Sequence, residues 1–578
     1  MHDFLSIYFI VLIIITALPV LIYSIGYMEE YKENYSIKYF WAMLLLFIFS
    51  MIGVAISPNA ISFIIFWELM SSSSFFLVIF EYKKSENIRS GIMYFIMTHI
   101  SGILIMVMFI FMGKFTGSLD FNTAASLAPM VNEKEKWTIL LIAFAGFGAK
   151  AGLVPLHGWL PKAHPCAPSN VSALMSGVML KIALYGFIRI YLMFSDNISF
   201  YFGVIVMITG AVTAAFGIIN ALFQSDIKKL LAYSSTENIG LIFCTLGLGF
   251  VLKALGQDIL GWAAITAALF HTLNHAVFKS LLFMGAGSII HSTSTKNMNE
   301  LGGLYNKLKF TGICVFIGTA AIAAIPPLNG FAGEVLILSS FIRAAVSVTN
   351  GGITLIIIFW GIILALTSGG VVWAFVKSYG TVFLGEPRTP RSAAPKSVPA
   401  SMNKGMSILA AAAVLLGVFS PLVINFIFMN ISKISSMNLV DYEITYISGM
   451  LLLIGIVTYI LCRQKAKGHA AVSDETWGCG FNRFKPYIQY SSEGHVQPGA
   501  RMLGAIAGYR KDVRIKETVY LKVRTRDIIE SNIYIRVIRL VNLIASRIIK
   551  IHYGKIQIYV SYIFISLIIS IVLVIRFI

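Results

Sequence analysis

Nine ionisable residues stand within segments that are otherwise apolar, and they are Glu68, Lys150, Lys181, Lys228, Glu237, His271, His275, Lys279 and Glu334. An amine, an imidazole or a carboxyl that is removed from water favours its neutral form, so it can exchange a proton near neutral pH. A row of such groups, close enough for short transfers bridged by water, has the chemistry needed to conduct protons. We therefore expect these nine residues to line a proton path.

Lys150 and Lys181 occupy two consecutive apolar segments. A lysine near the middle of a bilayer raises the free energy of insertion by about 2.5–3.5 kcal/mol or more, so its presence requires a reason. Gly152 and Pro155 follow Lys150 within five residues, and proline removes an amide donor and clashes with the preceding turn. We expect a broken helix with an ionisable group at the break. Lys181 could instead extend to an interface, although its position near mid-segment argues against that.

Glu68 lies in the apolar stretch ISFIIFWELMSSSSFF. A nearby cation would keep this carboxylate ionised, and Lys150 is the candidate partner. A pair with a purely structural role is the alternative.

His271, His275 and Lys279 are spaced four residues apart in HTLNHAVFK. On a helix this spacing places them on one face, over a rise of about 12 Å. Such a line suits proton hopping. A metal site from the two histidines is disfavoured, because no glutamate follows the first histidine and no third ligand is evident. Ordinary core histidines also fit the pattern.

Further polar residues are less decisive. Lys228 and Glu237 in DIKKLLAYSSTENIG are expected members of the buried row, whereas Lys229 could anchor the helix at the membrane surface. Three residues at or after the first break could line a vestibule, namely His157, Lys162 and His164. Arg343 and Lys377 could be anchors or the last members of the path.

The composition requires a membrane to hold these residues. The chain has 578 residues, of which 57% are hydrophobic and 12% charged, and its mean hydropathy is +0.81. It is predicted to be an all-α, polytopic membrane helix bundle. Its first apolar run is too long for a signal peptide and is interpreted as a retained span. Fourteen spans are expected, at 4–27, 39–57, 60–80, 89–112, 137–163 (broken), 169–194, 199–222, 230–251, 259–290, 310–346 (broken), 353–384, 406–429, 441–462 and 556–577.

The segment 310–346 is predicted to be a second broken helix. Its centre reads AAIPPLNGFAGE, with Glu334 beside the Pro/Gly break. Counting it as one span gathers the basic loops on one side of the membrane, as the positive-inside rule favours. Both termini are then expected outside, with the basic residues 463–555 on the cytoplasmic side. Two broken helices separated by four unbroken spans suggest two inverted repeats.

The C-terminal part differs in charge from the rest. The net charge is +19, and residues 463–555 hold 18 Lys/Arg against 7 Asp/Glu. No motif supports nucleic-acid binding, so we interpret this segment as a membrane-surface element in contact with lipids. Polar positions recur every three to five residues from Asp527 to Tyr553, which predicts an amphipathic interfacial helix that leads into the last span. It is either a plain surface helix or a strut that clamps neighbouring subunits.

The sequence offers no other chemistry. The five cysteines are scattered, which disfavours a zinc or iron–sulfur site and a disulfide framework. No hydrolase triad, phosphate loop or dinucleotide fingerprint is present. The expected divisions are N-terminal spans 1–57, an ion-translocating core 58–385, a loop with peripheral spans 386–462, a basic loop with the lateral helix 463–555, and an anchor span 556–578.

These motifs resemble a known family. The chain is similar to the antiporter-like proton-channel subunits of the complex I and Mrp antiporter superfamily. It looks closest to the large membrane subunit of energy-converting [NiFe]-hydrogenase and formate hydrogenlyase complexes. The likeness covers most of the chain and is most specific in 60–350. It rests on WELMS, GAKAGLVPLHGWLPKAHPCAPSNVSALMSGVMLK, DIKKLLAYSSTENIG, HTLNHAVFKSLLFMGAGSI, PPLNGFAGE and TWGCGF.

The resemblance implies a proton-translocating subunit in the inner (cytoplasmic) membrane of a prokaryote. Glu68 and Lys150 would form a charge-tuning pair that changes the proton affinity of Lys181, and protons would leave near Glu334. The chain would hold no cofactor itself. NiFe and iron–sulfur centres would lie in partner subunits, which include other membrane subunits and a peripheral hydrogenase/iron–sulfur arm. The chain would thus be part of an ion-translocating oxidoreductase without doing redox chemistry.

Two points stay open at the level of sequence. A subunit of a multisubunit Na⁺/H⁺ antiporter without a redox partner has the same core motifs. In addition, the resemblance implies that Glu68 belongs to the fifth span, whereas it lies on the third predicted span here. The resemblance therefore leads us to expect that two family helices have no counterpart among the spans predicted here.

Overall fold

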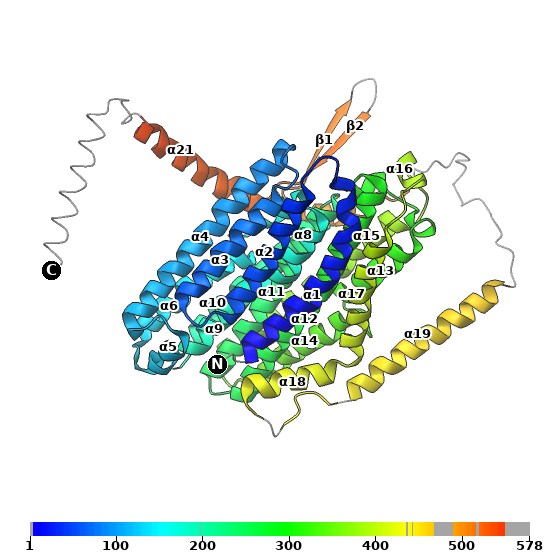
Figure 1. Cartoon of the computed structure of the whole chain (residues 1–578). Helices are drawn as coiled ribbons and strands as arrows, with labels where there is room; N and C mark the ends of the chain where they lie inside the picture. The colour runs from blue at the N-terminus through cyan, green and yellow to red at the C-terminus, as the bar shows by residue number, and fades with distance from the viewer. Residues whose placement is uncertain are drawn as a thin grey trace. The chain divides into compact units, whose positions relative to one another are not determined.

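The computed structural model describes residues 4–196, 198–434, 437–441, 443–467, 489–515 and 519–549 (Figure 1). The chain divides into two units, Met1–Thr525 and Arg526–Ile578. The first unit is built of helices, which are α1 (Phe4–Tyr27), α2 (Ile37–Ile56), α3 (Ala60–Val78), α4 (Ser85–Thr116), α5 (Phe121–Leu127), α6 (Glu133–Ala151), α7 (Leu160–Cys166), α8 (Ser169–Leu174), α9 (Leu180–Phe194), α10 (Phe200–Leu222), α11 (Ile227–Ala254), α12 (Asp258–Thr293), α13 (Lys309–Ile322), α14 (Asn329–Ser347), α15 (Gly351–Phe383), α16 (Pro390–Ala393), α17 (Ala400–Val418), α18 (Ser420–Ser432), α19 (Glu443–Lys467) and α20 (Ser492–Leu503).

The helical membrane fold is confirmed. Among the described residues, twelve helical segments are long and apolar enough to cross a membrane. The total of fourteen spans stays a prediction, because the segment 556–577 lies outside the described residues. A small antiparallel hairpin of β1 (Arg510–Ile515) and β2 (Val519–Arg524), with Arg510 opposite Arg524, was not predicted.

Both predicted breaks are present. The first helix of the first pair, α6, ends at Gly152, whose φ of +87° is a left-handed conformation that suits glycine. Its amide caps the carbonyl of Gly148 at 3.0 Å, and the chain runs through turns until α7 begins. The second pair is α13 and α14, which are separated by residues 323–328. Gly152 and Pro155 interrupt the helical hydrogen bonds at the first break, and Pro326 and Pro327 interrupt them at the second.

The predicted span 169–194 is one helical segment, in which a π-helical turn at Met175–Met179 lies between α8 and α9. A second segment that was predicted as a single helix is interrupted. In 406–429, Phe419 ends α17 and Pro421 begins the first turn of α18, where its missing amide is tolerated. The long apolar run hid this second interruption from the sequence pattern.

The most buried helices carry most of the ionisable residues. In the most apolar stretch of 18 residues, every residue is buried in 169–194 and in α11, and 94% are buried in α12. The close approach of α10 to α11 explains part of this burial. A Cβ atom at Gly210 would lie 2.2 Å from the amide nitrogen of Cys244, so only glycine allows the two backbones to touch.

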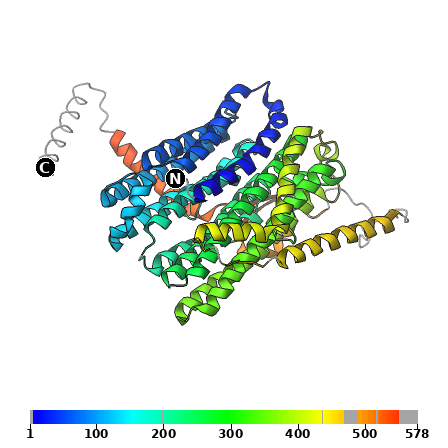
Figure 2. The same cartoon turned by 60° about the horizontal axis from the view of Figure 1, so that its bottom comes forward.

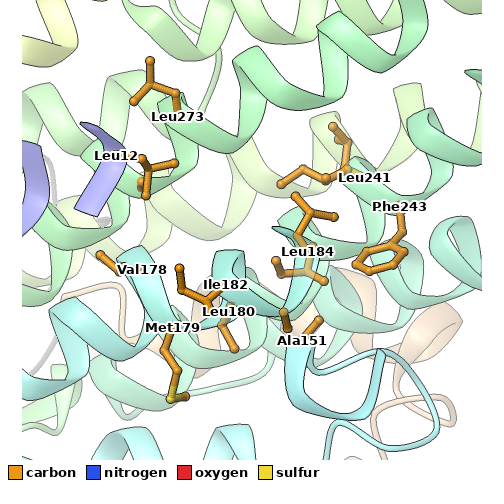
Figure 3. Packing of buried hydrophobic residues seen from close by; sticks show 14 of the residues in the cluster. Leu12, Ala151, Val178, Met179, Leu180, Ile182, Leu184, Leu241, Phe243 and Leu273 are labelled. Carbon is orange, nitrogen blue, oxygen red and sulfur yellow. The ribbon is translucent and has the colours of Figure 1, made fainter. Parts of the chain in front are cut away.

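Apolar side chains enclose the π-helical turn. Figure 3 shows buried residues of 178–184 near Leu12 of α1, Leu241 and Phe243 of α11, and Leu273 of α12.

The second unit is described from Arg526 to Ile549. It contains a π-helical turn at Glu530–Tyr534 and α21 (Ile535–Ile549), in which Arg536, Arg539 and Arg547 interrupt an apolar pattern. The predicted amphipathic helix is therefore present over these residues, and its interfacial location stays a prediction.

Candidate functional site

Lys150 lies in the last turn of α6 and is fully buried. Its ammonium donates a hydrogen bond to the hydroxyl of Ser71 on α3, with a distance of 2.8 Å. It also lies 5.4 Å from the ring centre of Tyr94 and 5.9 Å from that of Trp67. The partial negative charge at the C-terminal end of α6 and the two aromatic faces favour a cation here.

Glu68 does not form the expected ion pair with Lys150. In the part of the chain that the structure describes, no carboxylate oxygen lies within 4.0 Å of the Lys150 ammonium. Glu68 Oε2 instead lies 3.3 Å from Nε2 of His99 on α4, and the two side chains are 32% and 34% exposed. Glu68 still acts on Lys150 electrostatically over a longer distance. His99 was missed in the sequence, although it is an ionisable residue in an apolar span like the others.

Tyr94 connects this first cluster to the helix that carries Lys181. Its hydroxyl lies 2.6 Å from Ser74 Oγ on α3 and 3.3 Å from the sulfur of Met179. Tyr94 is fully buried. The sequence pattern did not single out this residue, because a tyrosine in an apolar span is commonly a packing residue.

Lys181 is fully buried directly after the π-helical turn. Its ammonium donates to the carbonyl of Ser176, a residue of that turn. The hydroxyl of Ser176 lies 2.7 Å from that of Ser235 on α11. The ammonium therefore ends inside the bundle, and the alternative in which Lys181 extends to an interface is wrong.

Lys279 and the histidines lie between α11 and α12. The ammonium of Lys279 donates to the hydroxyl of Ser234 and to the carbonyl of Leu231, the latter at 3.2 Å. His271 Nε2 lies 3.1 Å from Asn238 Oδ1. Neither ring nitrogen of His275 has a hydrogen-bond partner among the described residues, although the ring is fully buried.

The two glutamates continue this cluster towards α14 and α15. Glu237 accepts a hydrogen bond from Asn238 and is within electrostatic range of both Lys279 and Glu334. Glu334 lies beside the second break, is 9% exposed and contacts Ser368 of α15. The charges of Lys181 and Lys279 also act on each other. Lys181, Lys279, Glu237 and Glu334 are thus consecutive electrostatic neighbours.

The remaining candidates occupy the ends of helices. Lys228 is buried in the first turn of α11 and donates to the carbonyl of Ala167, just after α7. Lys377 is also buried and donates to the carbonyls of Leu222 at 2.5 Å and Gln224 at 2.8 Å, so it is not a surface anchor. His164 is buried between the rings of Trp159 and Phe283, and Arg343 is exposed.

No metal site is evident in this part of the chain. Among the described residues, no three His, Cys, Asp or Glu side chains gather closely enough to hold an ion. The pair His271 and His275 therefore has no third ligand in that region.

Comparison with known proteins gives the family. Residues 57–363, more than half of the chain, match the family described as "NADH:quinone oxidoreductase/Mrp antiporter, TM". Hydrogenase-4 component B of Escherichia coli is 40% identical over 423 residues, which are 72% of this chain and 61% of that protein. Formate hydrogenlyase subunit 3 of Escherichia coli is 33% identical over 372 residues, which are 63% of this chain and 58% of that protein. The chain thus spans about three fifths of the length of these two relatives.

A solved structure shares the fold. It is that of a subunit of the membrane-bound sulfane sulfur reductase, an archaeal respiratory membrane complex, with a TM-score of 0.76 and 23% identity. The match covers 98% of this chain and 88% of that one. The protein is a multi-pass membrane protein, and it belongs to the NADH:quinone oxidoreductase/Mrp antiporter transmembrane family.

Proposed function

We propose that this chain is the proton-translocating, antiporter-like membrane subunit of a redox-driven complex of the energy-converting hydrogenase or complex I type. The observation that carries the proposal is the buried sequence of electrostatic neighbours Lys181, Lys279, Glu237 and Glu334. Burying four ionisable groups inside a membrane helix bundle is unfavourable for stability, which supports a functional role for them. The similarity to hydrogenase-4 component B and formate hydrogenlyase subunit 3 supports the redox-driven class.

The contacts of each group suit proton transfer. The ammonium groups of Lys181 and Lys279 rest on hydroxyl and carbonyl oxygens and have no ion pair among the described residues, so each can lose its proton without leaving a carboxylate unpaired. Gain or loss of a proton at one member changes the proton affinity of the next. His275, whose ring nitrogens have no hydrogen-bond partner among the described residues, lies on the same helix one turn before Lys279. A proton therefore moves laterally from Lys181 through His275 and Lys279 to Glu237 and Glu334, with water bridging the steps.

The first cluster controls the start of this path. Glu68 has two basic neighbours, His99 in direct contact and Lys150 farther away. When Glu68 moves towards Lys150, the ammonium is stabilised in its charged form. When Glu68 returns to His99, Lys150 releases its proton more readily, and the potential at Lys181 changes.

Partners would supply the driving reaction. NiFe and iron–sulfur centres would be held by other subunits, including a peripheral arm, and would transfer the electrons. This chain would hold and move protons only. We place it in the inner membrane of a prokaryotic cell with both termini outside and the basic segment on the cytoplasmic side, as the positive-inside rule favours.

A sodium–proton antiporter subunit is the second candidate, because the matched family description includes Mrp antiporters. In that case the same buried row would work without a redox partner. The two candidates differ in the companions of the chain and in their need for Na⁺.

The test uses the intact complex, purified with its companions and reconstituted into vesicles. Lys279→Ala is expected to lower proton uptake coupled to electron transfer about ten-fold or more, equivalent to about 1.4 kcal/mol at the barrier. Lys150→Ala and Glu68→Ala should act in the same direction, while electron transfer to an artificial acceptor persists. Lys229→Ala, on a partly exposed lysine of the same helix end as Lys228, is the control. Unchanged proton uptake in the first three variants would contradict the proposal. Na⁺-dependent proton movement without a redox substrate would favour the antiporter.

A further inference from the structure

His164 is a buried titratable residue that the proposed path does not use. It lies on α7, and its ring stands 6.3 Å from that of Trp159 and 5.2 Å from that of Phe283, measured between ring centres. Both ring nitrogens are buried, and neither has a hydrogen-bond partner among the described residues. A histidine that serves only for packing normally has its nitrogens satisfied, so this ring is suited to exchange protons with bound water.

Three buried lysines act on this histidine electrostatically. They are Lys228 of α11, Lys279 of α12 and Lys181 of α9. Lys181 and Lys279 belong to the row of groups proposed for proton transfer, whereas Lys228 lies in the first turn of α11, at the end of the bundle. His164 is therefore a neighbour both of Lys228 and of the row.

A chain of hydroxyl groups leads from the loop after α3 towards Lys228. The hydroxyl of Tyr31 donates to a carboxylate oxygen of Glu81 at 3.4 Å and lies 3.5 Å from the hydroxyl of Tyr27. Helix α1, dark blue in Figure 2, ends at Tyr27 and packs against α8. The amide of Ser169, the first residue of α8, donates to the Tyr27 hydroxyl at 3.3 Å. Ser169 comes two residues after the carbonyl that Lys228 contacts.

The outer end of this chain is accessible to water. Glu81 lies in the loop between α3 and α4, contacts Lys84, and has a side chain that is 13% exposed. Its charge also acts on Lys228. Tyr27, at the inner end of the chain, is buried. A partly exposed carboxylate that leads through hydroxyls to a buried amine has the order of groups that proton uptake needs. We call Glu81, Tyr31 and Tyr27 the entrance.

We propose that the entrance admits protons to Lys228 and that His164 then transfers them from Lys228 to the row. This inference rests on the proposed function and adds to it the place where protons enter. Glu81 takes up a proton from water. Each tyrosine hydroxyl then receives one proton and releases another, and water completes the step to Lys228.

His164 can carry out its transfer because an imidazole has two nitrogens. One nitrogen accepts the proton that leaves Lys228, and the other releases a proton towards the row, so the ring returns to its neutral form. Because like charges repel, the ring accepts a proton most readily while the neighbouring lysines of the row are neutral. The row therefore admits a new proton after it has passed on the previous one.

The experiment measures proton uptake coupled to electron transfer, with a pH-sensitive dye, in the intact complex reconstituted into vesicles. Tyr27→Phe removes one hydroxyl of the chain and retains the ring, so uptake should fall about ten-fold. Glu81→Gln should act in the same direction, and Glu81→Asp should restore part of the rate. Tyr35→Phe is the matched control. The Tyr35 ring lies 6.2 Å from that of Tyr31, but its hydroxyl has no hydrogen bond among the described residues.

Two variants test the histidine. His164→Phe keeps an aromatic ring between Trp159 and Phe283, and His164→Gln keeps a polar side chain, but both remove the titratable nitrogens. Each should lower coupled uptake about ten-fold. Each should also raise the solvent deuterium isotope effect on uptake, because proton entry then limits the rate. A variant that only disturbs packing would leave this isotope effect at its wild-type value.

Lys279→Ala, measured in parallel, separates this inference from the proposed function. If Lys279→Ala lowers uptake while Tyr27→Phe or both His164 variants match the wild type, the inference is wrong and the row stands. If Lys279→Ala also leaves uptake unchanged, the proton path itself fails. Equal losses in Tyr35→Phe and Tyr27→Phe would overturn the entrance as well, because the effect would then come from the packing of the rings.

Discussion

At the scale of residues, the environment of Lys150 explains how a distant carboxylate can control it. An uncompensated ammonium in hydrocarbon is strongly unfavourable. The compensation here comes from the Ser71 hydroxyl, two aromatic rings and the end of α6, and no carboxylate of the described residues is in contact with the ammonium. Because these contacts stabilise the Lys150 ammonium only moderately, we expect a small displacement of Glu68 to change the balance between the charged and neutral forms of Lys150. In the proposed switch, His99 would hold Glu68 away from Lys150 through the contact of 3.3 Å between Nε2 and Oε2.

Removal of the Ser71 hydroxyl tests this interpretation. Ser71→Ala deletes the hydrogen-bond acceptor of the Lys150 ammonium, and hydrogen bonds to charged groups contribute about 1.5–3 kcal/mol. We expect coupled proton uptake to fall about ten-fold at neutral pH while electron transfer persists. Ser73→Ala is the matched control, since that hydroxyl donates only to backbone carbonyls of its own helix. Equal rates in the two variants would exclude a role for the Ser71 contact.

The sequence located the ionisable residues better than their contacts. Eight of the nine predicted site residues are buried and Glu68 is half-buried. Their burial could be predicted because an ionisable residue within an apolar span has few other stable positions. Their contacts could not be predicted, since Lys150 and Ser71 are 79 residues apart and no local sequence pattern connects them. Tyr94 and His99 escaped for the same reason.

At the scale of elements, the residue types at each helix interruption decided whether the interruption could be predicted from the sequence. Gly152 and the Pro326–Pro327 pair stand beside ionisable residues, so the two broken helices could be recognised from the sequence. The π-helical turn before Lys181 has no such marker, because MSGVM differs little from ordinary helical sequence. The turn is explained only in three dimensions, where its Ser176 carbonyl receives the Lys181 ammonium.

One helix within the basic loop was unexpected. Helix α20 packs against α15, where Trp373 Nε1 donates to the carbonyl of His495 at 3.1 Å. Glu493 accepts hydrogen bonds from Ser225 and Asn299, each at 2.7 Å. The predicted membrane-surface loop therefore includes a segment that docks on the end of the helix bundle near Lys377.

This docking should depend on pH. Burial, together with the charges of Lys377 and Arg388, lowers the pKa of His495 below its ordinary value of 6.5. The undocked form then binds the proton more tightly, so the contribution of neutral His495 to docking is fully present above about pH 6.5 and is lost as the pH falls below it. Hydrogen–deuterium exchange in 492–503, corrected for intrinsic rates, should show lower protection at pH 5.5 than at pH 7.5. His495→Gln should remove the difference, with α12 as the internal reference. Equal protection of wild-type α20 at both pH values would contradict this expectation.

At the scale of the whole molecule, the exposed face of α4 suggests where another subunit binds. Ile92, Ile96, Ile103 and Ile110 are each about half exposed and form an apolar stripe along α4. The pair of Glu68 and His99 interrupts this face while about one third exposed. A titratable pair that faced lipid at this depth would be unfavourable, whereas a neighbouring protein could cover it with polar groups.

Cross-linking in the intact complex tests this location. A photoreactive probe on Ile96→Cys, about one turn before His99 and 53% exposed, should join the chain to another membrane subunit. The matched control is Val212→Cys, 43% exposed on α10, where no ion pair lies among the described residues. We expect the control to react with lipid, because the exposed part of α10 carries no charged side chain that a partner must cover. If the Ile96 probe also captured only lipid, the pair of Glu68 and His99 would face the bilayer directly. A neighbouring subunit in contact with this pair could then not move Glu68 between His99 and Lys150.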